Sequence, residues 1–553
     1  MIVPMKHLTL VCVSEDAAKT LETLRDMGCV HVELAGAESP ASAAAKGDLE
    51  GAMEAVRLVM RARRAVGADT GASASRRTVE EVQELESARE AAQGEADELR
   101  RQIAIYEPYG DFDPALAKSL IDQGIDLSGV CELPDPLPRM RLSEMRRRLA
   151  DAEATVAARE AELAGTDETW ITGRYPELKD RVAFESVRDS LSTQGAVSWI
   201  EGWIPVDGVP RLRAKAVTKA WGLLLRDAEG GEMPPTLIRP PKLFRPVAAL
   251  FEGLGIAPGY TESDVSVPFL CYFSLFFAML VGDGAYGLIF LAATLWGWRK
   301  TRPKGDRHRP RLVRSWLTLL TVFSSATVLW GILSNTWFGA GLPFARNWPT
   351  VKWLADETYS NMMLLCFTIG VSHLMIARIW SGIQTINDRT CIAQFGWAGI
   401  LLFMYIVTNS IVGIFGGVPK WAFWMFGVSL VMVFGFTLKG SELKTRGIEL
   451  GMLPLNIMSA LGDIISYVRL FAVGLASVKV AENFNSMAVG LELPLWIKWL
   501  PLVLILLVGH GLNLAMAGLS ILVHAVRLNT LEFSNHKGVS WAGYAFKPFR
   551  KGG

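Results

Sequence analysis

Residues 456–485 read NIMSALGDIISYVRLFAVGLASVKVAENFN, and this stretch decides how the rest of the chain is interpreted. It is long and mostly apolar, as membrane-spanning helices are, yet it contains Asp463, Arg469, Lys479 and Glu482. An arginine at bilayer depth costs roughly 2.5–3.5 kcal/mol on insertion scales and is retained chiefly at functional positions. Arginine does not recur at every third position here, so an ion pathway is favoured over a voltage sensor. Lys479 and Glu482 lie three residues apart and can simply pair with each other.

The last apolar stretch, residues 509–533, has the same character. It reads GHGLNLAMAGLSILVHAVRLNTLEF and includes two histidines and an arginine. Asn513, Ser520 and Arg527 recur at every seventh position, so a helix would place them on one face. The helix face that carries Arg469 continues instead with small residues, which would let another helix approach closely. These small residues are Val473, Ala476 and Val480.

Both stretches are too long for upright membrane helices. About 33 residues rise ~50 Å as a helix, whereas the hydrocarbon core of a bilayer measures ~30 Å. An ordinary tilt of about 20° does not absorb that difference. We therefore expect two helices that are steeply inclined or that continue beyond the membrane, an arrangement suited to the curved outer wall of a ring.

The 553-residue chain has two halves of different composition, although its net charge is only +1. Residues 1–240 are rich in Glu, Arg, Lys and Ala, whereas residues 268–528 are dominated by apolar side chains. The near-zero charge argues against a nucleic-acid partner. The six cysteines form no CxxC pair, which favours unpaired thiols. We find no nucleotide-binding, catalytic, cofactor or metal motif, and no cleaved signal peptide at the start, so we expect the N-terminal half to be cytoplasmic.

Residues 1–265 predict a cytoplasmic domain of α/β lobes joined by a helical arm. Alternating and helical patterns indicate the lobes at 1–36 and 170–230. Residues 40–165 contain Ala/Glu/Arg-rich stretches with sparse apolar positions, which predict an antiparallel coiled-coil arm. A generic dimerising coiled coil remains an alternative for this pattern.

Residues 266–532 predict a mainly α-helical transmembrane domain, followed by a cytoplasmic tail at 533–553. The loop 299–314 has eight Lys and Arg residues and is therefore expected in the cytoplasm. Basic residues recur in alternate later loops and in the C-terminal tail, so the C-terminus is also expected in the cytoplasm. The remaining apolar spans are expected at about 315–338, 359–383, 391–415, 421–438, 452–488 and 495–528.

The first apolar segment, residues 268–298, presents a topological problem. Both of its flanks are expected in the cytoplasm, so it must cross an even number of times. Its 31 residues are too few for two crossings of about 20 residues each. We therefore predict two short helices, broken in the sequence GDGAYG, which gives about eight membrane segments in all. The residues of the break are Gly282, Asp283, Gly284 and Gly287.

Several motifs, in the same order along the chain, resemble those of one family. Residues 466–476, SYVRLFAVGLA, resemble the SYxRLxAxxLA signature of the membrane stator subunit of V/A-type rotary ATPases, which is called subunit a or, in prokaryotes, subunit I. GHGLN at 509–513 and HAVRL at 524–528, followed by Glu532, resemble the last helix of that family. The sequence GDGAYG, the segment EGWIP at 201–205 and the tail at 543–549 resemble three further elements.

This resemblance implies a non-catalytic, ion-translocating subunit, with ATP hydrolysis on other chains. Arg469 and Arg527 map onto the two functional arginines of the family, between two half-channels for H⁺ or Na⁺ that lead to carboxylates of a rotor ring. The implied partners are the rotor c/K ring, peripheral-stalk subunits of the E/G type at the cytoplasmic lobes, and lipid. One departure is Ala517, where some relatives have an acidic residue. The candidates to line the half-channels are Glu442, Glu449, Asn456, Asp463, Ser466, His510, Asn513, Ser520 and His524.

A secondary transporter and a membrane-anchored scaffold are two alternative classes of protein for this sequence. A secondary transporter predicts matching broken helices in two halves, but only one break is visible. A membrane-anchored scaffold explains the arm, but it leaves Arg469 and Arg527 without a role. Copurification with a rotor ring and an ATPase head separates these alternatives.

Overall fold

The structure is a computed structural model that describes residues 2–67, 75–123, 134–302, 311–345, 347–354, 359–437, 443–492 and 494–552. The chain divides into two compact units, which are described separately. The N-terminal unit comprises Lys6–Asp227 with Lys547–Gly553, and the helical unit comprises Met1–Met5 with Ala228–Phe546. The division between the two compact units falls at 227/228, because helix α9 (Val247–Leu254) buries apolar side chains in the core of the helical unit. The boundary at 265/266 between a cytoplasmic and a transmembrane domain stays a prediction.

The N-terminal unit is built on one five-stranded sheet in the order β2-β4-β1-β5, with β3 paired to β4. The strands are β1 (Met5–Val13), β2 (His31–Val32), β3 (Ser192–Gln194), β4 (Val197–Pro205) and β5 (Gly222–Asp227). The segments 1–36 and 170–230, which the sequence predicts as α/β lobes, thus both contribute strands to one sheet. Strand β1 pairs with β5, and β2 pairs with β4, so each segment completes the sheet of the other.

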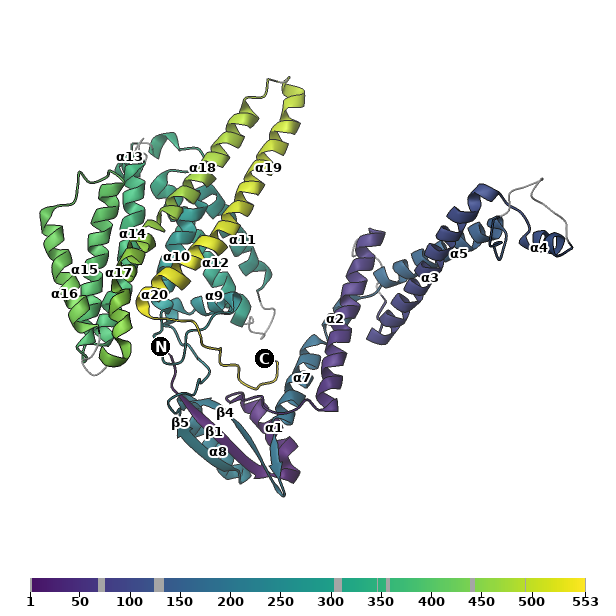
Figure 1. Cartoon of the computed structure of the whole chain (residues 1–553), viewed down its shortest axis with the longest axis horizontal. Coiled ribbons are helices and arrows are strands. Elements are labelled where there is room, and N and C mark those ends of the chain that lie inside the picture. Colours follow the sequence, from purple (N-terminus) through teal and green to yellow (C-terminus); the bar gives the residue numbers. More distant parts are fainter. Residues whose placement is uncertain are drawn as a thin grey trace. The chain divides into compact units, whose positions relative to one another are not determined.

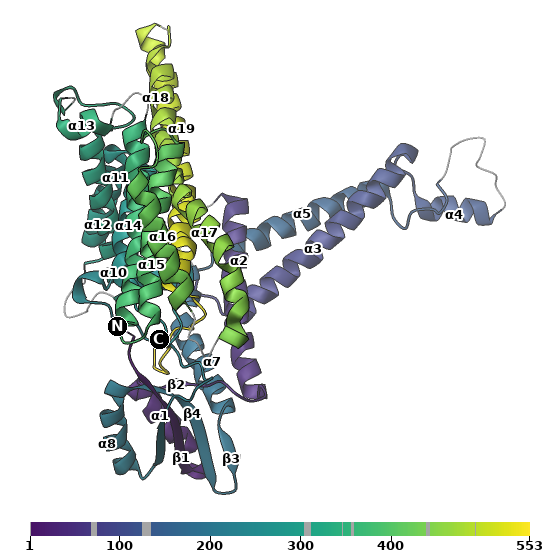
Figure 2. The same ribbon diagram turned by 60° about the vertical axis from the view of Figure 1, so that its left-hand side comes forward.

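Two helices, α1 (Ala17–Met27) and α8 (Val209–Lys219), pack their apolar residues into the core of this sheet. Leu8 and Leu10 of β1 are fully buried in that core. Side chains alternate along a strand, so His7 lies on the opposite face of the sheet from Leu8. Figure 2 shows α1, α8 and the strands together.

Beyond the sheet, the arm consists of helices that lie side by side. Thr78 begins α3 with a capping box, in which its side chain and that of Glu81 exchange hydrogen bonds with backbone N–H groups. Ion pairs Arg100–Glu153 and Arg89–Glu160 join α3 to α5 with opposite numbering, so the two helices are antiparallel (Figure 1). The helices are α2 (Pro40–Val66), α3 (Val79–Tyr106), α4 (Pro114–Asp122), α5 (Leu142–Ala164), α6 (Glu168–Thr172) and α7 (Tyr175–Asp189).

The helical unit begins its main bundle with a broken pair of helices, as the sequence predicts. Helices α10 and α11 meet at 120° around Gly282 and Asp283. Gly282 has a φ of +69°, which favours glycine. The carboxylate of Asp283 accepts hydrogen bonds from Ala285 N and Gly339 N, both at 2.8 Å, and is buried within the protein. The bounds are α10 (Ser266–Val281) and α11 (Gly284–Lys300).

Eight further helices complete the described part of this unit apart from short helical turns. They are α12 (Arg311–Ser334), α13 (Pro349–Leu354), α14 (Ser360–Gln384), α15 (Thr390–Ile411), α16 (Lys420–Phe436), α17 (Leu443–Ile465), α18 (Val468–Val489) and α19 (Leu495–Ser520). Two π-helical turns, Ile521–Ala525 and Leu528–Phe533, and the short α20 (Ser534–Lys537) extend α19. Among the described residues, five continuous helical stretches are long and apolar enough to span a membrane, besides the bent pair and the shorter α16. The count of eight membrane segments stays a prediction.

The last two membrane stretches are much longer than the others. Residues 451–489 form a stretch of 39 residues, and residues 498–537 form one of 40. At 1.5 Å per residue, each is ~60 Å long. In Figure 1, α18 and α19 lie side by side and are inclined to α14, α15 and α16. The apolar part of residues 498–537 is only 17% buried, compared with 33% to 50% for the other four stretches, so the last stretch keeps a large apolar face uncovered within this chain.

Candidate functional site

Arg469 and Arg527 converge on one buried carboxylate, that of Glu532. Arg469 Nη2 donates to Glu532 Oε1 at 2.8 Å, and its Nε donates to the carbonyl oxygen of Ser466 at 2.9 Å. Arg527 Nε lies 3.3 Å from the same Oε1 atom. The side chain of Glu532 is 5% exposed, that of Arg469 23% and that of Arg527 55%. We call these three residues the arginine cluster.

The π-helical turns explain how Arg527 and Glu532 meet. Residues five apart do not share a face in a regular α-helix, where neighbours are three or four apart. A π-helical turn instead links positions five apart, and such turns are common at functional sites. Leu528–Phe533 forms a turn of this kind directly after Arg527.

Two polar atoms in and beside the arginine cluster are buried without a hydrogen-bond partner among the described residues. They are Glu532 Oε2 and His524 Nδ1. Leaving such atoms unpaired typically costs about 1–3 kcal/mol each, and more for a charged group. An arrangement of this kind is expected where a further group, an ion or water completes the site.

A second set of polar residues, the His510 cluster, lies at the break between α10 and α11. The hydroxyl of Tyr286 is 2.7 Å from His510 Nδ1, and it accepts a hydrogen bond from Asn513 Nδ2 at 3.1 Å. Asn513 Oδ1 accepts a hydrogen bond from Ser477 Oγ at 3.0 Å. His510 Nε2 lies 3.2 Å from Asn485 Oδ1. This cluster joins α11, α18 and α19 through continuous hydrogen bonds.

A third set, the His536 cluster, contains Asp463. Its Oδ2 atom is 3.0 Å from Nε2 of His536 in α20. On the other side of the ring, Arg378 Nε donates to His536 Nδ1 at 3.0 Å, and Arg378 also donates to Gln394. The cluster thus links α14, α15, α17 and α20.

The two histidine clusters lie on opposite sides of the arginine cluster along both long helices. Ser477 and Asn485 follow Arg469 along α18, whereas Asp463 precedes it on α17. With a rise of 1.5 Å per residue, Ser477 is ~12 Å beyond Arg469, and Asp463 is ~9 Å before it. In the last helix, the His510 cluster comes first along the chain, then the arginine cluster and then the His536 cluster. This order is the reverse of that in α17 and α18, because α19 is antiparallel to α18.

The other residues predicted to line the half-channels contribute no side-chain hydrogen bond to the three clusters in the described part of the chain. Asn456 is exposed on α17, and Ser520 contacts none of the three clusters through a hydrogen bond in the described part of the chain. Ser466 takes part through its carbonyl oxygen, while its hydroxyl donates to Gly462. Glu449 lies in α17, and Glu442 lies outside the described residues.

The break glycines serve close packing. A Cβ at Gly284 would come within 3.0 Å of Gly331 Cα, and one at Gly287 within 2.8 Å of Val328 N. These glycines therefore let α11 approach α12. Lys479 and Glu482 pair with each other at 2.7 Å on an exposed surface, which confirms the simpler expectation for them.

Several residues of the clusters were not among the sequence candidates. Glu532 was noted only as part of a motif, because its spacing from Arg527 does not indicate a shared helix face. Tyr286 belongs to the GDGAYG break, where only the glycines and the aspartate have a residue type that indicates a break in a membrane helix. His536 and Arg378 come from segments far apart in the sequence, and no local pattern connects them.

Comparisons with known proteins agree with the motifs. No family model matches the chain. The chain is 27% identical to V-type ATP synthase subunit I 1 of Treponema pallidum, with all of both proteins aligned. It is 32% identical over 395 residues to V-type ATP synthase subunit I of Borreliella burgdorferi, which covers 67% of this chain and 63% of that protein. It is also 27% identical to A-type ATP synthase subunit I of Methanocaldococcus jannaschii, over 64% of this chain and 55% of the relative. The chain belongs to the subunit I family of V-type and A-type ATP synthases.

Proposed function

We propose that this chain is the membrane stator subunit of a rotary V/A-type ATPase or ATP synthase, and that it guides H⁺ or Na⁺ to and from carboxylates on a rotor ring. The observation that carries the proposal is the arginine cluster, in which two arginines on two overlong helices share one buried carboxylate. The names of the relatives support the same assignment.

The order of the three clusters along the helices suits a path for an ion. The His510 cluster and the His536 cluster each offer polar atoms within the apolar helical unit, and the arginine cluster lies between them along α17, α18 and α19. Fixed positive charge at that place would repel a cation that tried to pass directly from one cluster to the other. An ion would instead have to leave on a moving carboxylate, which couples its transfer to rotation.

Arg469 is suited to oppose such a carboxylate. A guanidinium stays protonated and presents five N–H donors, so Arg469 can keep its bond to Glu532 and still bind a second carboxylate. A cation beside the ring carboxylate favours its ionised form and so promotes ion release. Val473 and Ala476, small and not buried, follow on α18 and would let a ring helix approach.

The N-terminal unit is proposed to bind the peripheral stalks. Its antiparallel helix pair, α3 and α5, has many exposed ion pairs, as expected of a solvated arm. Such an arm can separate and hold other subunits without catalytic residues of its own. We place this unit and both termini in the cytoplasm, with the helical unit in the cell membrane.

The decisive experiment is Arg469→Ala in the assembled complex, reconstituted into lipid vesicles with its ring and ATPase head. We expect ATP-driven ion uptake to fall to background while the complex still assembles. Arg469→Lys should also be badly impaired, because a desolvated ammonium can lose its proton and cannot reach two carboxylates with a planar fork. Arg527→Ala should be milder, since that side chain is more exposed.

Lys479→Ala is the matched control, because it removes a cation from the same helix at an exposed ion pair. Its uptake should equal that of the wild type. Normal ion uptake by assembled Arg469→Ala complexes would refute the proposed mechanism.

A further inference from the structure

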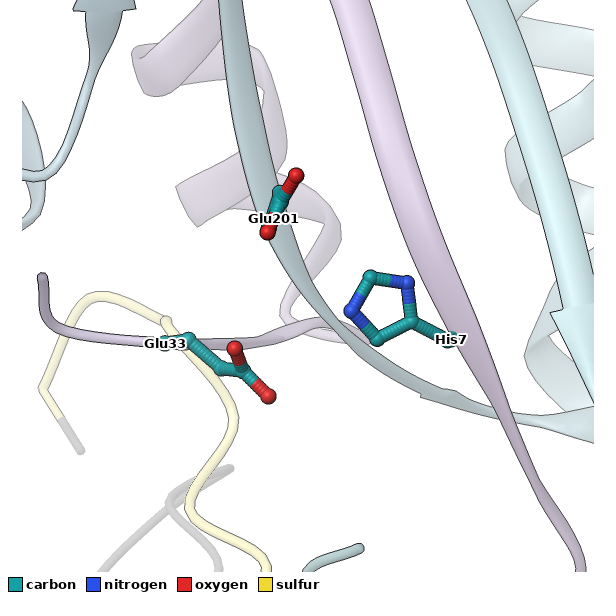
Figure 3. A group of neighbouring side chains, drawn as sticks. All are labelled: His7, Glu33 and Glu201. Carbon is teal, nitrogen blue, oxygen red and sulfur yellow. The ribbon is translucent and has the colours of Figure 1, made fainter. Parts of the chain in front are cut away.

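In the N-terminal unit, three side chains from distant parts of the sequence converge on the sheet face opposite the helix-packed core. They are His7 of β1, Glu33 directly after β2, and Glu201 of β4 (Figure 3). One ligand atom from each lies within 4.8 Å of the others. None of these residues belongs to the proposed ion pathway.

The two carboxylates face each other across a strand pair. The register of β2 and β4 pairs Val32 with Gly202, and Glu33 N donates to the carbonyl oxygen of Glu201 at 3.1 Å, so Glu33 lies opposite Glu201. Like charges directly opposite in a sheet are destabilising. A Cβ at Gly202 would collide with the carbonyl oxygen of His31, so glycine is needed for the close approach of these strands.

The imidazole of His7 makes no hydrogen bond within the described part of the chain, although the residue is buried. It is 7% exposed, and its one ring contact is an edge-to-face contact with Trp203, at 5.0 Å between ring centroids. A buried imidazole normally has hydrogen-bond partners for its nitrogens. Figure 3 shows a ring nitrogen directed toward the two carboxylates.

Trp203 also orients one of the carboxylates. Its indole N–H donates to Glu33 Oε1, which leaves the other oxygen of Glu33 available. Glu201 is exposed, and its carboxylate has no partner in the described part of the chain. The Trp203 contact resembles the outer hydrogen bonds that fix the carboxylate ligands of metal sites.

We propose that His7, Glu33 and Glu201 form a binding site for a divalent transition-metal ion, with Zn²⁺ as the best fit. A cation between the carboxylates would remove their repulsion and give His7 a partner. One imidazole nitrogen with two carboxylates suits Zn²⁺, whereas Mg²⁺ and Ca²⁺ prefer oxygen ligands alone. Zinc bonds measure about 2.0–2.2 Å, so small side-chain rotations would close the site. The ion would clamp β1, the end of β2 and β4 together.

The test is zinc binding by the full chain, purified in detergent without a histidine tag and stripped of metal with a chelator. Zn²⁺ is titrated in competition with a chromophoric chelator, and Co²⁺ is used in parallel for its ligand-sensitive visible spectrum. The wild type should bind one more equivalent of Zn²⁺ with high affinity than Glu201→Gln, whose affinity at this site should fall at least about tenfold. Glu201 is exposed, so this variant is expected to fold.

His7→Gln should give the same loss, and Glu22→Gln on the exposed face of α1 is the matched control with wild-type binding. Hydrogen exchange provides a second readout, because Zn²⁺ should slow exchange in β4 of the wild type but not of Glu201→Gln. The proposal is overturned if wild type and Glu201→Gln bind Zn²⁺ alike, or if the site prefers Mg²⁺ or Ca²⁺ to Zn²⁺.

Discussion

Glu86 in the arm and Glu532 in the helical unit are each approached by two arginines, yet their surroundings differ. In the arm, Glu86 binds Arg89 through both oxygens at 2.8 Å, and Arg61 lies at 3.5 Å. In the helical unit, both arginines reach only one oxygen of Glu532, and the other oxygen is buried without a partner among the described residues. Both carboxylate oxygens of Glu86 therefore accept hydrogen bonds, whereas only one of the two oxygens of Glu532 does.

The difference is the one expected between an ion pair that only stabilises the fold and the ion-translocating site that we propose. A bidentate pair uses the full geometry of guanidinium and carboxylate, so nothing more is needed to stabilise it. At Glu532, the unused oxygen and the unused donors of Arg469 leave room for another charged group to bind and depart. We propose that a carboxylate of the rotor ring is the further group that the arginine cluster binds, whereas the Glu86 pair has no such role.

The largest effect is expected from Glu532→Gln. Loss of the charge leaves both arginines without their carboxylate, and breaking a buried ion pair costs roughly 3–5 kcal/mol. Arg469 would then be mispositioned, and ATP-driven ion uptake in reconstituted complexes should fall below about a tenth of the wild-type rate, which corresponds to about 1.4 kcal/mol. Glu482→Gln, at the exposed pair with Lys479, is the control. Ion uptake at the wild-type rate by Glu532→Gln would show that the Glu532 carboxylate is not required for ion transport, which would contradict the proposed difference from Glu86.

A smaller effect is expected from Asn513→Ala, which tests a fully partnered polar group inside the helical unit. The change removes hydrogen bonds to Ser477 and Tyr286, and each buried group left unpaired costs about 1–3 kcal/mol. We expect a lower midpoint of thermal unfolding for the full chain in detergent. Asn456→Ala, at an exposed position on α17, should leave that midpoint unchanged. Equal midpoints for the two variants would show that the His510 cluster contributes no stability.

The smallest effect is expected in the pH dependence of the stability of the arm. The hydrogen bond from Arg89 holds the pKa of Glu86 below its usual value of about 4.3, against an opposing effect of partial burial. Because the folded-state pKa is lowered, the stabilisation is present above the unfolded value and is lost as the pH falls through the folded one. Hydrogen exchange in α3, corrected for intrinsic rates, should therefore quicken below about pH 4.3. In Glu86→Gln this additional acceleration should be absent, and an identical pH profile would contradict the assignment.

Local patterns predicted the features that depend on neighbouring residues. The break at Gly282 and Asp283 follows from a segment that is too short for two crossings, and the length of the last two helices follows from the length of the mostly apolar sequence. Pairings between distant segments were not predictable in this way. Strand β1 joins β4 and β5 across roughly 190 to 220 residues, and His7 meets Glu201 only through the pairing of β1 with β4. Glu532 was missed because local spacing assumes α-helical turns.

The π-helical turns also constrain how this protein can change by insertion or deletion. Each such turn accommodates an extra residue compared with an α-helical turn. Removing one residue from 521–533 would rotate every later side chain by about 100° and draw it back by about 1.5 Å. His536 would then swing away from Asp463 and Arg378, although no residue of that cluster had been altered. The length of this short segment is therefore as much a part of the site as the residues that line it.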